Sequence, residues 1–225
     1  IDKKGEPLYG SVMEALANAL RGVIVPSPNH TLFVADYAAI EARVLLWLAN
    51  DQDALEIFRR GEDIYCWMAS DIYGYPTNKS DHPAERALGK VAVLGLGYQM
   101  GWSKFIDTCL AMAGIVIEEE LAQRTVTTYR EKFYRVKQMW WDMEQAAIEA
   151  TLDDDNAIEC GKVTWLTEGR FLYCQLPSGR RLAYPDPQVR MREMPWGEKR
   201  RGLTFMGVDT YTHQWKRQTT YGGML

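Results

Sequence analysis

Four side chains between positions 86 and 98 have the types and the spacing to bind a nucleoside triphosphate. At about 100° per residue, they fall on one helix face within an arc of about 120°: Arg86, Lys90, Leu94 and Tyr98. A guanidinium can bind phosphate oxygens through two hydrogen bonds, and an ammonium one turn later is a point charge for the same polyphosphate. The apolar and aromatic positions offer a surface to a sugar and a base. Spacing alone favours the simpler interpretation, a partly solvated helix whose two basic residues bind nothing.

Phosphate chemistry also needs a metal-binding partner, and Asp36 is the candidate. Residues 31–35 form a short apolar run typical of a buried strand, and the run from Ile40 to Leu48 has helical spacing. Asp36 is therefore expected where a strand ends, so that its carboxylate is held by a rigid element and faces a cleft.

Together the two segments resemble the family A DNA polymerases, the DNA polymerase I type, which includes phage members. The segment 36–43 matches the first palm motif of the family at Asp36, Tyr37, Ile40, Glu41 and Arg43. The segment 86–98 matches the fingers-helix motif, with its spacing kept, at Arg86, Lys90, Gly95 and Tyr98. The order of the motifs and the distance between them also fit. The resemblance extends more loosely over nearly the whole chain, including residues 61–65 and 179–182.

The resemblance implies template-directed DNA synthesis, with primer-template DNA and deoxynucleoside triphosphates as partners and two Mg²⁺ ions as cofactors. Asp36 and the backbone carbonyl of Tyr37 would be metal ligands. Arg86 and Lys90 would hold the β and γ phosphates, and Lys90 would also donate a proton to the departing pyrophosphate.

Four further residues would contact the nucleotide. Tyr98 would pack beside the nascent base pair, and Glu41 would crowd the 2′ position of the sugar. Leu94 stands where the family usually has phenylalanine or tyrosine. Tyr65 stands where a histidine is common, and a tyrosine can donate a hydrogen bond to phosphate but cannot carry a positive charge.

The expected fold is a mostly helical α+β fold, the fingers plus part of the palm, with a small antiparallel sheet. Residues 1–48 would be partial palm, residues 49–215 the fingers, and residues 216–225 the start of the return to the palm. The second metal carboxylate of the family belongs to a His-Asp-Glu type motif, and no histidine here is followed by Asp-Glu. We therefore expect a truncated chain that is inactive or nearly inactive alone.

Local patterns predict where the helices and strands lie. Helices are expected at residues 11–20 with Ser11 as cap, 40–50, 53–59, 63–73 and 83–98 with Asp81 as cap. A long one is expected over 117–152, with a bend or break inside it and a buried stripe formed by Tyr129, Phe133, Val136, Trp140, Met143 and Ala147. Trp140 and Trp141 cannot both face one core, so one of them is expected at an edge. Strands are expected at residues 162–166, 171–176, 181–184 and 203–208.

Composition is that of an ordinary soluble globular protein, with 47% hydrophobic and 25% charged residues in 225. The net charge of −4 argues against nucleic-acid binding by bulk charge. Residues 179–217 nevertheless hold nine basic and four acidic side chains, which is typical of a local nucleic-acid surface or equally of a solvated face. The most apolar run, residues 91–102, is too short for the roughly 20 residues of a membrane span.

Four scattered cysteines suggest neither a zinc site nor a disulfide framework, so a reducing compartment is expected, the cytoplasm of a bacterium or a phage-infected host. Two other functions stay open. A two-metal nuclease would also use a strand-end aspartate, but it would need more clustered carboxylates and would not need the basic helix face. A non-catalytic interaction module built on the long aromatic helix is the second.

Overall fold

The computed structural model describes residues 12–153, 155–193, 197, 199–209 and 212–220, and it divides the chain into two compact units. The first unit runs from Ile1 to Ala38 and the second from Ala39 to Leu225. The described part of the first unit contains the helix α1 (Val12–Ala19), followed by a 3₁₀ helix, η1 (Leu20–Val23). The helix expected at residues 11–20 is thus present, and its expected cap, Ser11, lies outside the described residues.

The strand expected at residues 31–35 is absent, and that prediction was wrong. The segment is extended but its side chains are open to solvent, with Phe33 93% and Val34 96% exposed. A strand needs a partner for its backbone N–H and C=O groups, and no described strand pairs with this segment. Asp36 therefore lies in an extended loop rather than at the end of a strand.

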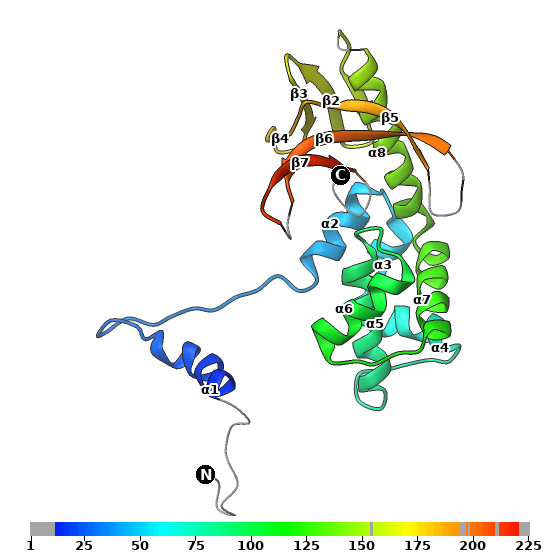
Figure 1. The fold of residues 1–225 in the computed structure, drawn as a ribbon. Coiled ribbons are helices and arrows are strands. Elements are labelled where there is room, and N and C mark those ends of the chain that lie inside the picture. The colour runs from blue at the N-terminus through cyan, green and yellow to red at the C-terminus, as the bar shows by residue number, and fades with distance from the viewer. Residues whose placement is uncertain (1–11, 154, 194–196, 198, 210–211, 221–225) are drawn as a thin grey trace, which may run out of the picture. The chain divides into compact units, whose positions relative to one another are not determined.

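The second unit begins with seven helices in its described residues (Figure 1). They are α2 (Ile40–Leu48), α3 (Gln52–Arg59), α4 (Ile64–Tyr73), α5 (Pro83–Leu96), α6 (Trp102–Ala113), α7 (Glu119–Lys132) and α8 (Tyr134–Leu152). All were predicted except α6, and the expected break in the long helical segment falls at Phe133, between α7 and α8. None of the described helices is long and apolar enough to cross a membrane.

The start and end of α5 differ from the prediction. Asp81 does not cap the helix, because its carboxylate accepts a hydrogen bond from the Asn78 side chain at 2.9 Å. His82 occupies the cap position without a side-chain hydrogen bond to the helix, and Pro83 fills the first turn. The helix ends at Leu96, so Tyr98 lies in the turn that follows.

Seven strands in the described residues form two antiparallel sheets where one was expected. Sheet A has the order β1 (Ile158–Cys160), β2 (Val163–Glu168), β3 (Phe171–Gln175) and β4 (Arg181–Pro185). Sheet B has the order β5 (Gln188–Glu193), β6 (Lys199–Val208) and β7 (Trp215–Thr219). The four predicted strands correspond to β2, β3, β4 and β6, whereas β1, β5 and β7 were not predicted. The mostly helical α+β class is confirmed.

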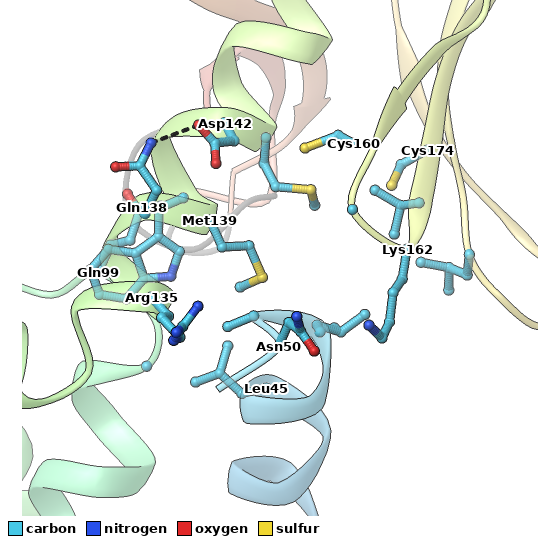
Figure 2. A pocket seen from close by; sticks show the side chains of 18 of the residues that line it. Leu45, Asn50, Gln99, Arg135, Gln138, Met139, Asp142, Cys160, Lys162 and Cys174 are labelled. Carbon is cyan, nitrogen blue, oxygen red and sulfur yellow. Dashed lines mark hydrogen bonds between the residues drawn. The ribbon is translucent and has the colours of Figure 1, made fainter. Parts of the chain in front are cut away.

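Helix α8 links the helical part of the second unit to its sheets, because it contacts α7 as well as strands of both sheets (Figure 1). Its second half packs against both sheets in a core that includes Ala147, Trp165 and Leu203. The guanidinium of Arg200 on β6 also lies 3.1 Å from the carboxylate of Glu144 on α8. A cavity of about 560 Å³ opens between α8, the end of α2 and sheet A (Figure 2).

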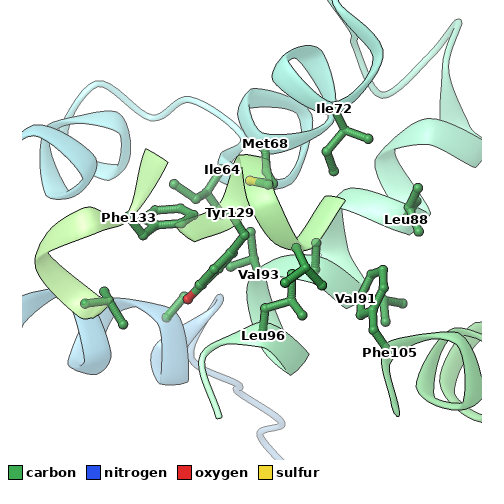
Figure 3. Close-up of a cluster of buried hydrophobic side chains, with 14 of the residues drawn as sticks. Ile64, Met68, Ile72, Leu88, Val91, Val93, Leu96, Phe105, Tyr129 and Phe133 are labelled. Atoms are coloured by element: carbon green, nitrogen blue, oxygen red, sulfur yellow. The ribbon is translucent and has the colours of Figure 1, made fainter. Parts of the chain in front are cut away.

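A larger hydrophobic core fills the space between the helices α2 to α8 (Figure 3). Of the predicted stripe, Tyr129, Phe133 and Val136 are buried in this core. Trp140 packs at its margin whereas Trp141 is 46% exposed, so one tryptophan does lie at an edge.

Helices α4 and α5 approach each other closely at Gly89, where an added Cβ would lie 2.2 Å from the carbonyl oxygen of Tyr65. Glycine is the residue that permits this contact, because any side chain would collide with the backbone of α4. The close contact sets the distance between the start of α4 and the middle of α5.

Candidate functional site

The residues predicted to bind a nucleotide lie in order along α5 and the turn after it. Arg86 is half-buried at the start of the helix, Lys90 is exposed one turn later, and Leu94 is half-buried another turn on. Lys90 makes no ion pair with any side chain in the described part of the chain. Tyr98 is 52% exposed, and its backbone N–H donates to the carbonyl of Gly95 at 3.2 Å. The predicted face is therefore three helical residues followed by an aromatic residue in a turn.

Glu41, Leu94 and Tyr98 line one cavity of about 370 Å³ between α2 and α5, which we call the α2–α5 cavity. The other described residues on its wall are apolar: Ile40, Ala42, Val44, Leu45, Leu48, Val93 and Gly97. Glu41 is the one charged group among these lining residues. Three residues that sequence analysis assigned to the nucleotide from two distant motifs thus share a single concave surface.

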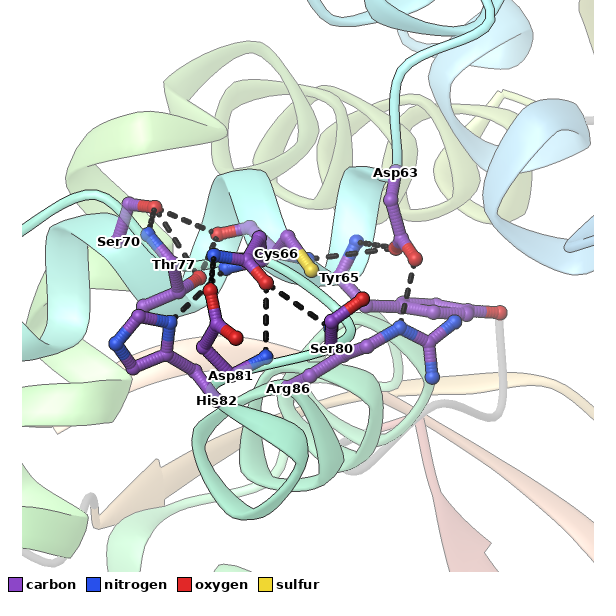
Figure 4. Close-up of polar contacts among 10 residues, drawn as sticks. Asp63, Tyr65, Cys66, Ser70, Thr77, Ser80, Asp81, His82 and Arg86 are labelled. Atoms are coloured by element: carbon purple, nitrogen blue, oxygen red, sulfur yellow. Dashed lines mark hydrogen bonds and ion pairs between the residues drawn. The ribbon is translucent and has the colours of Figure 1, made fainter.

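Arg86 is held by Asp63, which precedes α4 (Figure 4). Its Nε donates to Oδ2 of Asp63 at 2.6 Å. The other carboxylate oxygen, Oδ1, accepts from the backbone N–H groups of Tyr65 at 2.9 Å and Cys66 at 3.3 Å, and so caps α4. The guanidinium carbon of Arg86 lies 5.2 Å from the centre of the Tyr65 ring. Arg86 and Tyr65, both predicted phosphate ligands, are therefore neighbours.

The geometry of this pair leaves Arg86 able to bind an anion. The contact with Asp63 uses Nε of Arg86. An arginine that binds a phosphate end-on donates two hydrogen bonds from its two terminal nitrogens instead. Asp63 can therefore orient the guanidinium while the two terminal nitrogens stay available for a phosphate. The contact of Asp63 with Arg86 was not predicted from the sequence. An aspartate before an apolar helical run signals a cap, but no local pattern shows a contact with a residue 23 positions away.

The charge of Asp63 is expected to stabilise the fold in a pH-dependent way. Burial alone would raise its pKa, but hydrogen bonds from Arg86 and from two backbone N–H groups outweigh burial and hold the pKa below its ordinary value. A carboxyl whose folded pKa is lowered stabilises the fold above its unfolded pKa near 4, and this stabilisation is lost as the pH falls through the folded pKa.

We expect Asp63→Asn, which keeps an oxygen for the cap, to lower the free energy of unfolding by about 1 kcal/mol at pH 7 because the pair is partly screened by solvent. The difference should shrink below about pH 4. Urea unfolding at pH 7 and pH 3 measures it. Asp51→Asn is the control. Asp51 likewise caps its helix, α3, by accepting from the backbone N–H of Ala54, but burial raises its pKa. The loss of stability that shrinks at low pH is therefore expected for Asp63→Asn and not for Asp51→Asn. An Asp63→Asn difference that is equal at both pH values would contradict the role of the charge.

Asp36 and Tyr37 lie in the first unit, and both are exposed. Their carboxylate and carbonyl oxygens are donors of the type that suits Mg²⁺. Within the described ranges, however, no group of three or more His, Cys, Asp or Glu side chains could hold a metal ion. The donor type fits the expected ion, but these two residues alone supply too few ligands for a site with two ions.

Ion pairs with carboxylates of the same chain neutralise part of the positive charge of residues 179–217. Four of the nine cations in this segment pair with carboxylates: Arg181 with Glu168, Arg200 with Glu144, Lys216 with Asp209 and Arg217 with Asp186. Arg181 joins β4 to β2 and Arg200 joins β6 to α8, whereas Lys216 and Arg217 join β7 to the segments that follow β6 and β4. These contacts favour a structural role for the four. Arg180, Arg190, Lys199 and Arg201 are exposed and remain candidates for contact with nucleic acid.

Comparison with known proteins supports the motifs. The model of DNA polymerase family A matches residues 11–153. The DNA polymerase of Bacillus phage SP02 is 36% identical over 221 residues, which are 98% of this chain and 33% of that protein. The thermostable DNA polymerase I of Thermus aquaticus is 26% identical over 183 residues, 81% of this chain and 19% of that protein. The chain thus spans a third or less of these relatives.

Proposed function

Because this chain belongs to DNA polymerase family A, we propose that it supplies the nucleotide-binding part of a DNA-directed DNA polymerase. One observation carries the proposal: Arg86, Lys90 and Leu94 follow one another along α5, and Leu94 lines the cavity that Glu41 and Tyr98 also line. Cations, an apolar side chain and an aromatic ring follow one another in the order of the phosphates, sugar and base of a deoxynucleoside triphosphate.

In this proposal the nucleotide lies along α5 with its triphosphate at the start of the helix. Arg86, directed by Asp63 and flanked by Tyr65, binds phosphate oxygens, and Lys90 binds the same polyphosphate as a point charge. In this proposal Lys90 also protonates the departing pyrophosphate. Leu94 contacts the sugar, with Glu41 across the cavity excluding a 2′-hydroxyl.

Asp36 and the carbonyl of Tyr37 would be ligands of the catalytic Mg²⁺ ions, together with residues outside the set described above. Two bound Mg²⁺ ions supply activation of the primer 3′-hydroxyl and neutralisation of charge on the triphosphate. We assign residues 1–48 to part of the palm, 49–215 to the fingers and 216–225 to the return toward the palm. The partners would be primer-template DNA and deoxynucleoside triphosphates, in the cytoplasm of a bacterium or of a phage-infected host.

Photolabelling with two nucleotides tests the direction of the substrate. A deoxynucleoside triphosphate with an azide on its base should label residues 97–99, next to the α2–α5 cavity. One with an aryl azide on its γ-phosphate should label the region between Asp63 and Lys90. Peptide mapping by mass spectrometry locates both labels, and an excess of unlabelled triphosphate is the control. Labels in the reverse order, or on the two sheets, would contradict the proposal.

A further inference from the structure

The face of sheet A that points away from α8 carries aromatic side chains that the proposed function does not use. We propose that this outer face binds single-stranded DNA, whose bases stack on the aromatic rings. The inference does not depend on the proposed function, because the groove on this face shares no lining residue with the α2–α5 cavity. It assigns a second DNA-binding surface to the two sheets.

The alternation of side chains along β3 fixes which residues lie on the outer face. Leu172 and Cys174 are buried in the core under α8. Phe171 and Tyr173 alternate with them along the strand and therefore point the opposite way. The two rings stack, with centres 5.9 Å apart and planes at 29° to each other. Together they form a flat aromatic surface on the outer face of sheet A.

A groove of about 420 Å³ extends this surface toward sheet B, where β3 and β4 lie near β6 and β7 (Figure 1). Phe171 lines the groove together with Pro185, Met206 and Trp215. Phe171 is 38% exposed and Trp215 is 58% exposed. Large flat rings that are open to solvent are good stacking surfaces for nucleic-acid bases. Phe171 thus connects two further rings, because it shares the groove with Trp215 and stacks on Tyr173.

Positive charge lies beside the aromatic rings. Arg170 lines the groove and is exposed, and it forms no ion pair with another side chain in the described part of the chain. The guanidinium carbon of Arg181 lies 5.5 Å from the centre of the Tyr173 ring. The carboxylate of Glu168 is paired with Arg181 at 2.9 Å, so its negative charge is partly neutralised. Cations next to flat rings match a ligand that has both phosphates and bases.

Hydrogen bonds between the two sheets hold the groove in shape. The backbone N–H of Asp186 donates to the carbonyl of Arg170 at 2.8 Å, and Arg217 donates to the carbonyl of Asp186 at 2.9 Å. The carboxylate of Asp186 accepts from Arg217 and from Gln188. Asp186 also has a φ of 49°, in the left-handed region that favours glycine, and these contacts fix it there. A groove formed in advance reduces the ordering cost of binding.

A single strand suits this surface better than a duplex does. In a duplex the bases stack on each other and present only their edges in the grooves. Unpaired bases can instead lay their flat faces on protein rings, whatever the sequence, while cations contact the phosphates. Because the chain belongs to DNA polymerase family A, we assign the strand as DNA.

The first test measures binding of the 225-residue chain to a labelled oligothymidylate of about ten nucleotides by fluorescence anisotropy, without Mg²⁺ or triphosphate. Trp215→Ala should weaken binding roughly 5- to 150-fold, because the stacking of one base is lost. Trp215→Phe keeps a flat ring and should restore most of the affinity. Trp141→Ala is the matched control, because Trp141 is 46% exposed on α8 and lies outside the groove. Equal affinities of the two alanine variants would overturn the proposal.

Salt dependence and a duplex supply two further readouts. Arg170→Ala should reduce the slope of log affinity against log salt by about 0.7, the loss of one phosphate contact to a single strand. Arg124→Ala, which changes an exposed arginine of α7 outside the groove, should leave the slope unchanged. Trp215→Ala should not weaken binding to a duplex of the same length. Equal slopes for the two arginine variants, or equal weakening for duplex and single strand, would contradict binding of unpaired bases.

Photocrosslinking separates this surface from the proposed nucleotide site. An oligothymidylate in which 5-iododeoxyuridine replaces one base should crosslink to residues 170–173 and to Trp215, and an excess of unmodified oligothymidylate is the control. Peptide mapping by mass spectrometry locates the crosslinks. Crosslinks confined to residues 86–99 would overturn this inference and leave the proposed function intact. Crosslinks at the groove, in a chain that triphosphate photolabels do not mark along α5, would support the inference while the proposed function fails.

Discussion

The 225-residue chain is expected to give no primer extension, whereas a longer version that also carries a His-Asp-Glu type motif should extend primers. The reason is electrostatic. Two divalent ions a few Å apart repel each other strongly, and Asp36 is the one carboxylate of this sequence that we propose as a metal ligand. The attacking hydroxyl would therefore stay unactivated. Gel analysis of a labelled primer measures the product.

Asp36→Ala in the longer version is the matched control, and it should abolish extension while leaving the fold of the second unit unchanged. Robust extension by the 225-residue chain would show that another carboxylate completes the site. Glu41 would be the first candidate, because it lies on the wall of the α2–α5 cavity.

We expect the longer enzyme to reject dideoxynucleotides and Leu94→Tyr to relax that rejection. Leu94 lines the α2–α5 cavity with Glu41 and Tyr98, so a side chain at this position faces the space proposed for the sugar. A tyrosine hydroxyl there can replace the 3′-hydroxyl that a dideoxynucleotide lacks, whereas leucine has no donor. A hydrogen bond from this tyrosine hydroxyl to a charged group of the bound nucleotide would contribute about 1.5–3 kcal/mol. The ratio of dideoxy to deoxy incorporation should therefore rise roughly 10- to 150-fold.

Leu94→Phe is the control for that experiment, because phenylalanine restores the flat ring without the hydroxyl. It should speed nucleotide addition through better contact with the sugar and leave the dideoxy ratio near that of the unchanged enzyme. An unchanged ratio for Leu94→Tyr would mean that position 94 does not face the sugar, and the register assigned from Arg86 to Tyr98 would have to be redrawn.

Local signals explain which elements were predictable. Helices α2 to α5 have clear apolar periodicity, and α4 also has a capping aspartate at Asp63. Helix α6 was missed because its first residue, Trp102, was counted as the end of the preceding apolar run. The strands β5 and β7 carry charged residues such as Arg190 and Lys216, which hide the alternation of a sheet. The strand predicted at residues 31–35 was wrong because a strand forms only where another strand pairs with its backbone. The sequence of the segment itself does not show whether such a partner exists.

The same distinction applies to the candidate site. The order of Arg86, Lys90 and Leu94 along α5 follows from helix geometry, so the sequence was sufficient to predict it. The contact between Asp63 and Arg86 depends on the packing of α4 against α5, which Gly89 permits. The apolar walls of both cavities likewise arise only when α2 meets the end of α5. Contacts between elements were therefore the part that required the structure.

Titration of the chain with a labelled deoxynucleoside triphosphate and Mg²⁺ tests most directly whether the face of α5 binds the substrate. Lys90→Ala removes an exposed ammonium from that face, and Arg180→Ala removes an exposed cation in the turn between β3 and β4, where it contacts Ser178. A charge-assisted contact contributes about 1.5–3 kcal/mol, so Lys90→Ala should weaken binding roughly 10- to 150-fold and Arg180→Ala should leave it unchanged. Equal loss of affinity in both variants would contradict the assignment of α5 as the triphosphate site.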